Sequence, residues 1–210
     1  REDDIVRLVE ETVRLTGGLD GVVANAGGGG AIAPYHRQEV DEFVRVLHLN
    51  LLGAMLLVKH GVRHLAAARE AEDGTVGGSF VAISSIAGHL THPHFGAYSV
   101  AKAGLESMMR NAADEYGSLG VRFNSVCPGF TTTEVMSVIP RDSEVYASYI
   151  ENTPLGEVGT PADVAEVVAF LLGDAGRWVN GQTIDVDGGH TLRRGPDFSS
   201  FVGDDALSFD

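Results

Sequence analysis

Apolar runs separated by helical stretches constrain the fold of this chain more than any other feature. Residues 19–24, 79–84 and 121–126 have the length and composition of buried strands, and residues 182–186 are expected as a final strand. Helical periodicity fills the segments around them: residues 3–16, 38–70, 97–116 and 160–172. Because strands joined through helices need crossover connections, they pair in parallel. The sequence therefore predicts an α/β fold, a doubly wound parallel sheet covered on both faces.

Glycine and proline mark several element boundaries. Gly17-Gly18 ends the first helix, and Thr160-Pro161-Ala162-Asp163 is a capped helix start with proline at its first position. Residues 38–70 are expected as one long helix, or as two joined near Gly53 or Gly61.

The remaining segments are less regular. Residues 131–152 lack a single apolar face, and such a stretch is typical of a mobile lid. The last twenty residues are partly acidic and contain a proline. We therefore predict one domain over residues 1–190 and a C-terminal tail over residues 191–210.

Composition narrows the function classes. The chain has 210 residues, 44% of them hydrophobic, which suits one globular domain with a sizeable core. Its net charge of −14 argues against a nucleic-acid or anionic-membrane partner, since such partners need a clustered excess of Lys and Arg. The longest apolar stretch, residues 44–62, is too interrupted by polar residues to span a membrane. The single cysteine, Cys127, is expected as a buried thiol and fits a reducing, cytoplasmic compartment.

Tyr98 and Lys102 stand four positions apart within a predicted helix. Residues at this spacing share a helix face, so the phenol and the ammonium can meet. A nearby cation favours the phenolate and is expected to lower the pKa of Tyr98. Ser85 ends an apolar strand thirteen residues upstream. A tyrosine and a lysine at this spacing are weak evidence alone, and the neighbouring motifs must decide.

Those motifs occur in a recognisable order along nearly the whole chain: Asn25-Ala26-Gly27, Asn50, Ser85, Tyr98, Lys102, Pro128-Gly129 and Val186-Asp187-Gly188-Gly189. In this order and at these intervals they resemble the short-chain dehydrogenase/reductase family. The resemblance implies a Rossmann-type fold and an oxidoreductase that transfers a hydride between a nicotinamide cofactor and a secondary alcohol or ketone.

The resemblance also implies a role for each catalytic candidate. Tyr98 would be the general acid/base, and Lys102 would lower its pKa and hold the nicotinamide ribose. Ser85 would orient the substrate oxygen, although Ser84 competes for this role. Asn50 would hold a water in a proton relay to the lysine, or else be an amide that packs within its helix.

A cofactor site is expected where strands end. Asn25, Ala26 and Gly27 follow a strand, where parallel sheets bind ligands, although a simple turn is the other reading. The family's usual second asparagine is Ala24 here. After Pro128 and Gly129, the resemblance assigns the nicotinamide carboxamide to the backbone of Thr131, which replaces an aliphatic residue, and to the hydroxyl of Thr133. The cofactor is NAD or NADP, and these residues do not distinguish the two.

His89, His92 and His94 form a small cluster between Ser85 and Tyr98. No cysteine or carboxylate stands at ligand spacing in the sequence, and the family chemistry needs no metal. We therefore expect no metal site, and instead loop histidines or a wall of the substrate pocket.

The glycine-rich phosphate loop of a dinucleotide-binding fold is absent, and the run Gly27 to Gly30 does not replace it, because it follows a later strand. In the family arrangement three strands would precede Arg1. The chain is then a fragment of a longer enzyme or a naturally truncated descendant. The first is favoured, because truncation would expose the edge of strand 19–24.

Three functions stay open after the sequence alone. The first is a secondary-alcohol dehydrogenase, and the second is a 3-oxoacyl-carrier-protein reductase of the same family. The third is a truncated, non-catalytic binding or scaffold protein. The family's association surface corresponds to residues 38–70 and 97–117, so we expect a homo-oligomer, a dimer or a tetramer.

Overall fold

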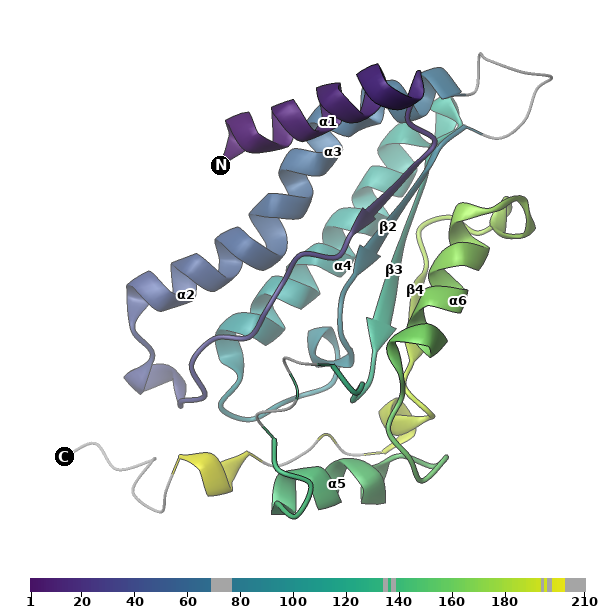
Figure 1. The fold of residues 1–210 in the computed structure, drawn as a ribbon. Coiled ribbons are helices and arrows are strands. Elements are labelled where there is room, and N and C mark those ends of the chain that lie inside the picture. Colours follow the sequence, from purple (N-terminus) through teal and green to yellow (C-terminus); the bar gives the residue numbers. More distant parts are fainter. Residues whose placement is uncertain (69–76, 134–135, 137–138, 194, 196–197, 203–210) are drawn as a thin grey trace.

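A parallel sheet of four strands forms the centre of the part of the chain that the computed structural model describes, residues 1–68, 77–133, 136, 139–193, 195 and 198–202. The strands are β1 (Gly21–Ala24), β2 (Ser79–Ile83), β3 (Arg122–Pro128) and β4 (Thr183–Val186). They lie in chain order, and every pairing is parallel, with Val22 opposite Phe80 and Phe80 opposite Phe123. Figure 1 shows these strands side by side between layers of helices.

Helices cover both faces of this sheet. On one side α3 (Gly53–Ala67) and α4 (Gly96–Tyr116) pack on the strands, and α1 (Glu2–Thr16) packs on α3. On the other side lies α6 (Pro161–Leu172), as Figure 1 shows. Because strand side chains alternate between faces, Phe80 and Ala82 join the cluster under α3 and α4, whereas Val81 joins the cluster under α6. The predicted doubly wound α/β fold is confirmed.

The predicted helix over residues 38–70 is interrupted near Gly53. α2 (Val40–Leu47) passes into a π-helical segment, His48–Leu52, which leads directly into α3. Gly61 lies inside α3 and is no break. Single π-helical turns often occur at functional sites. This one carries Asn50, which is buried with 2% of its surface exposed.

The expectation of a loose stretch over residues 131–152 is wrong for its second half. Helix α5 (Glu144–Asn152) begins there, with the Ser143 side chain accepting a hydrogen bond from the Tyr146 amide at 3.2 Å. The buried residues of α5, Val145 and Tyr149, pack in an aromatic cluster. In this cluster Tyr149 packs against Phe130 and Phe198.

Phe198 belongs to the segment expected to be a tail, yet it is 3% exposed. A short 3₁₀ helix, Ser199–Phe201, follows it. At Phe198 the chain is therefore packed against the folded unit.

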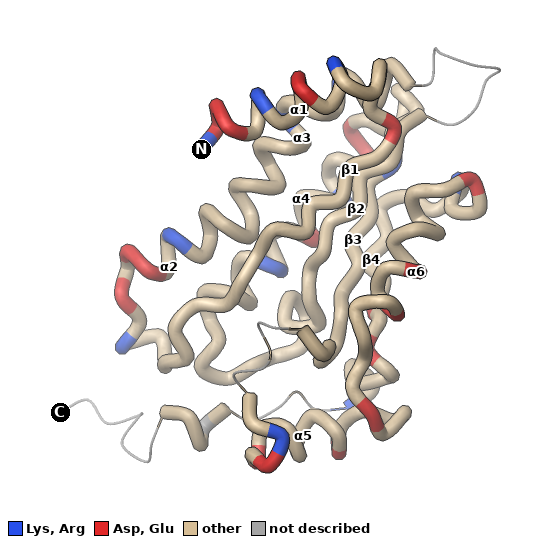
Figure 2. The backbone as a smooth tube through the Cα atoms, in the orientation of Figure 1, with Lys and Arg blue, Asp and Glu red and all other residues tan. Residues whose placement is uncertain are grey.

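The charge distribution fits the composition. Figure 2 shows basic positions scattered along the chain, interleaved with acidic ones on α1. Among the residues described, each helix is too short or too polar to traverse a lipid bilayer.

Candidate active site

The residues singled out in the sequence gather at the carboxyl edge of the sheet. Asn25 follows β1, Ser85 follows β2 and Gly129 follows β3. α4 begins at the same edge, so Tyr98 lies in its first turn. In parallel sheets this edge is where ligands bind, because all strand ends and helix N-termini meet there.

The Ser85 side chain lies close enough to the Tyr98 hydroxyl to lower the pKa of the phenol. Ser85 has extended backbone and caps the 3₁₀ helix Ile86–Gly88, where its Oγ accepts from the Ala87 amide at 3.2 Å. This cap fixes the Ser85 side chain. Burial raises the pKa of Tyr98 above its ordinary value, and the Ser85 side chain opposes that rise.

Lys102 lies one turn further along α4 and is 3% exposed. Its Nζ donates to the Ile83 carbonyl at 2.8 Å and lies 5.4 Å from the centre of the Tyr98 ring. Burial lowers the pKa of Lys102 to about 8, against the raising effect of Cys127 and Glu106. The prediction that the Tyr98 pKa falls is wrong for this structure, because the ammonium faces the ring and a carbonyl and burial dominates.

Asn50 holds the glycine loop that follows β1. Its Oδ1 accepts from the Gly28 amide at 3.1 Å, and its Nδ2 donates to the Gly28 and Val46 carbonyls, each at 2.9 Å. A methyl group at Gly27 would lie 2.7 Å from Asn50 Oδ1 and 3.3 Å from Lys102 Nζ. The loop therefore passes directly over the asparagine and the lysine, and only glycine permits that approach. The relay role of Asn50 stays a prediction.

The second candidate cofactor segment is built by the ends of β3 and β4. A methyl group at Gly129 would lie 2.8 Å from the Asp187 backbone, so a glycine is needed there. Thr131 forms an isolated parallel bridge with Gly159, in which the amide of Thr132 and the carbonyl of Phe130 make the bonds. The backbone N–H and C=O of Thr131 itself therefore point away from Gly159. The Thr133 hydroxyl accepts from the Met136 amide at 3.4 Å.

Aromatic rings that the sequence reasoning missed extend from Tyr98 across the site. Phe95 lies 4.8 Å from Tyr98, and Phe198 stacks on Phe95 at 5.7 Å between ring centres. Tyr149 meets Phe198 edge-on at 6.4 Å and stacks on Phe130 at 4.4 Å. Only their tertiary contacts reveal this set, because the rings come from four segments that are far apart in the chain.

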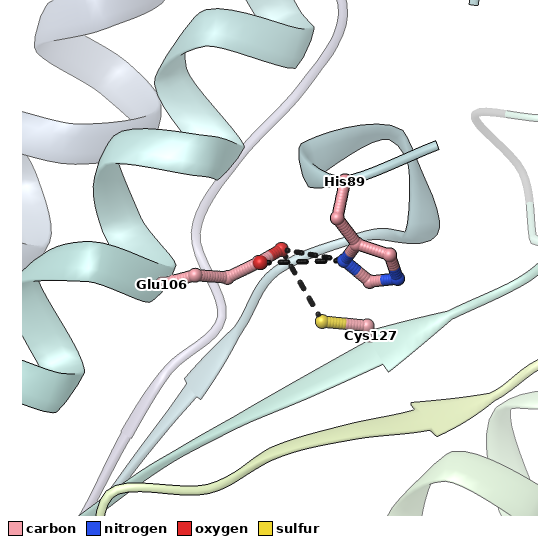
Figure 3. Close-up of side chains that lie close together, drawn as sticks. All are labelled: His89, Glu106 and Cys127. Carbon is pink, nitrogen blue, oxygen red and sulfur yellow. Dashed lines mark hydrogen bonds and ion pairs between the residues drawn. The ribbon is translucent and has the colours of Figure 1, made fainter. Parts of the chain in front are cut away.

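The three histidines line one pocket but differ in their polar contacts where these are known. His92 Nδ1 donates to the Leu90 carbonyl at 2.8 Å, and burial lowers the pKa of this histidine. His89 instead meets Glu106 and Cys127 (Figure 3). The sequence places no carboxylate or cysteine at ligand spacing from these histidines, and the fold nevertheless brings Glu106 and Cys127 to His89, because spacing along the chain cannot show which strands and helices converge.

Comparisons with known proteins agree with this architecture. Residues 1–191 match the family model described as enoyl-(acyl carrier protein) reductase. The cis-4-hydroxycyclohexanecarboxylate dehydrogenase of Sinomonas cyclohexanicum is 37% identical over 190 residues, which cover 90% of this chain and 73% of that protein. The glucose 1-dehydrogenase of Gluconobacter oxydans is 32% identical, with 91% and 70% covered.

A solved structure of a short-chain type dehydrogenase/reductase from Mycobacterium ulcerans superposes on the whole chain with a TM-score of 0.93. It is 41% identical, and this chain covers 75% of it. The chain belongs to the short-chain dehydrogenase/reductase family. It is accordingly an NAD(P)-dependent oxidoreductase, and the sequence-based resemblance to this family is confirmed.

Proposed function

We propose that this oxidoreductase interconverts a secondary alcohol and a ketone, with Tyr98 as the general acid/base. The observation that supports this most is the placement of the Ser85 hydroxyl beside the Tyr98 phenol at the carboxyl edge of the sheet, with Lys102 Nζ 5.4 Å from the centre of the same ring. In reduction Tyr98 gives its phenolic proton to the carbonyl oxygen, and in oxidation it takes the alcohol proton. Ser85 both donates and accepts, so it can orient the reacting oxygen in either direction.

Lys102 and Asn50 support this proton transfer. The Lys102 ammonium over the Tyr98 ring stabilises negative charge as the phenol ionises. Asn50 keeps the loop at Gly27 and Gly28 in place next to the Lys102 side chain. We retain the proton relay through Asn50 as part of the proposal.

The strand ends fit a nicotinamide cofactor, NAD or NADP. Two close backbone approaches support the fit, at Gly27 above Lys102 and at Gly129 beside Asp187. The holding residues would be Asn25, Ala26, Gly27, Tyr98, Lys102, Pro128, Gly129, Thr131 and Thr133. The Thr131 peptide, which points away from Gly159, suits a backbone contact with the carboxamide. When bound, the cofactor accepts or supplies the hydride.

The proposed substrate is a secondary alcohol with an apolar ring or a similarly bulky body. Phe95, which is partly exposed, offers flat apolar surface next to the Tyr98 ring, and the buried Phe198 stacks behind it. A relative that is 37% identical is named for a hydroxycyclohexane carboxylate.

Isotope transfer tests the reaction type in the full-length protein. With cyclohexanol deuterated at the carbinol carbon and oxidised cofactor, we expect deuterium at C4 of the nicotinamide and a slower turnover. Deuterium released to water instead would contradict direct hydride transfer.

We also propose a homo-oligomer in the cytoplasm. The homo-oligomer is supported by a groove of about 470 Å³ along α2, α3 and α4. Its lining includes the apolar side chains of Leu51, Met55 and Met108 together with polar ones. The cytoplasmic location is supported by Cys127, whose thiol is fully buried and forms no disulfide. Light scattering on the full-length protein tests assembly, and a monomeric mass would contradict it.

A further inference from the structure

Glu106 is a buried carboxylate behind the proposed catalytic residues. It lies four positions after Lys102 and eight after Tyr98, on the same face of α4, and is 4% exposed. A buried carboxylate is costly unless donors satisfy its oxygens, so its contacts indicate what it does. None of the roles proposed above uses Glu106.

The shortest of these contacts is with Ser84, the residue next to Ser85. The Ser84 hydroxyl donates to Glu106 Oε1 at 2.8 Å and lies 3.3 Å from the Lys102 carbonyl. Ser84 directly follows β2, and Ser85 follows it. The side chain of Ser84 therefore ties the end of β2 to α4, the helix that carries Tyr98 and Lys102.

Two further donors approach the same carboxylate from other elements, as Figure 3 shows. The Cys127 thiol of β3 donates to Oε1 at 3.4 Å, and His89 Nδ1 lies 3.3 Å from Oε2. His89 also reaches β4, because its Nε2 lies 3.1 Å from Asp185 Oδ1. Glu106 thus joins α4 to β2, to β3 and to the loop after Ser85.

The packing around the carboxylate is close. A methyl group at Gly88 would overlap the Glu106 carboxylate, so the loop that starts at Ser85 is seated directly on this side chain. A shift of Glu106 would therefore move Ser84 and the 3₁₀ helix Ile86–Gly88 together. Ser85 lies between these two points of contact.

We propose that Glu106 is a positioning residue, which holds the Ser84-Ser85 segment against α4 and thereby sets the geometry between the Ser85 and Tyr98 hydroxyls. The inference rests on the proposed function, since it acts through Ser85 and Tyr98. Hydrogen-bonding geometry of this kind must be held to a fraction of an ångström for efficient proton transfer.

Metal binding is the alternative role for His89, Glu106 and Cys127, since each offers one ligand atom. The observations favour hydrogen bonding. A metal needs the thiolate, whereas burial raises the pKa of Cys127 and keeps the thiol protonated. Glu106 Oε1 also already accepts from both Ser84 and Cys127.

The test compares Glu106→Ala and Glu106→Gln in the full-length protein, with Glu115→Gln as the control on an exposed position of the same helix. We expect Glu106→Ala to lower kcat by about 100-fold, with cofactor Kd changed less than about threefold. Glu106→Gln keeps an oxygen for Ser84 and should recover about tenfold of that loss. Should Glu106→Ala fail to fold, the Gln variant, which has the same shape, carries the test. Unchanged kcat in both, or in the Gln variant alone if only it folds, would overturn the proposal.

A pH profile gives a readout that loss of packing alone would not move. The groups facing Lys102 are Glu106 and Tyr98 from α4 and Cys127 from β3, and the charge of Glu106 raises the Lys102 pKa. In Glu106→Gln this pKa falls further below about 8, so the alkaline limb of kcat should move to lower pH. An unmoved limb together with wild-type kcat counts against positioning.

Coupling with Ser84 completes the test. If Glu106 acts through Ser84, the double variant Ser84→Ala with Glu106→Ala should be no more than about threefold slower than Glu106→Ala alone. Multiplicative losses would overturn the proposal.

The metal content of the purified protein is a separate check. One equivalent of zinc in the wild type that disappears in Glu106→Gln would also overturn the proposal. Tyr98→Phe separates the two hypotheses, because an active Tyr98→Phe enzyme refutes the proposed function, whereas wild-type kcat in the Glu106 variants refutes only positioning.

Discussion

The ammonium nitrogen of Lys102 lies 5.4 Å from the centre of the Tyr98 ring and hydrogen-bonds to a main-chain carbonyl rather than to the phenol oxygen. Both residues are on one face of α4, and burial dominates the pKa of each. Burial raises the Tyr98 pKa and lowers that of Lys102, so the two groups favour their neutral forms more than free side chains do.

Removing the Tyr98 hydroxyl should abolish turnover. Tyr98→Phe keeps the ring against Phe95 but removes the proton and the partner of Ser85. We expect kcat to fall by about 10³-fold, with cofactor Kd within about threefold of wild type, measured by steady-state kinetics and fluorescence titration. Tyr116→Phe, at the far end of the same helix, is the matched control and should behave as wild type. Substantial turnover by Tyr98→Phe would refute the assignment.

Lys102 should make the free energy of unfolding depend on alkaline pH. Its pKa is about 8 in the fold, against about 10.4 when unfolded, so between these values the unfolded state binds more protons. The folded state is therefore stabilised by this group as pH rises from about 8 towards 10.4. Relative to Lys102→Met, wild type should gain up to about 3 kcal/mol between pH 7 and 10 in urea titrations. A pH-independent difference between the two proteins would contradict the shift, since other titrating groups are common to both.

Two adjacent glycines should respond differently to one methyl group. In Gly27→Ala the new Cβ would lie 2.7 Å from Asn50 Oδ1, whereas in Gly28→Ala it would meet a Leu49 side-chain carbon at an ordinary 3.7 Å. We expect Gly27→Ala to destabilise the protein by about 1–3 kcal/mol and to weaken cofactor binding. Gly28→Ala should change both by much less. Thermal unfolding and cofactor titration measure the pair, and equal effects would refute the close approach over Asn50.

Phe198 should discriminate between large and small substrates. Phe198→Ala removes a ring that is 3% exposed and stacked on Phe95, which should raise KM for cyclohexanol by about tenfold. For 2-propanol the change should stay under about threefold, because a small alcohol contacts less of the Phe95 face that Phe198 supports. Phe201→Ala, in the same segment but 41% exposed, is the control. Equal losses for both alcohols would mean that Phe198 supports the fold without contacting substrate.

Elements that bury one regular face were predictable from the sequence. α6 illustrates this, since Thr160 and Asp163 form the reciprocal cap that their spacing suggested, and the helix ends before Gly173. α5 was missed because it packs on aromatic side chains instead of on the sheet, so its pattern lacks a clear period. The same reason hid Phe198, whose contacts come from residues far away in the chain.

The sequence by itself determined the parallel α/β fold, because strand and helix periodicity are local properties. Its ordered motifs identified Ser85, Tyr98 and Lys102 as candidates through their resemblance to the family. Tertiary structure decided the direction of the Tyr98 pKa, the seating of Gly27 over Asn50, and the contacts of Glu106 with Ser84, His89 and Cys127. These depend on burial and on which strand ends meet α4. Both quantities exist only when distant segments pack together, and so local pattern cannot supply them.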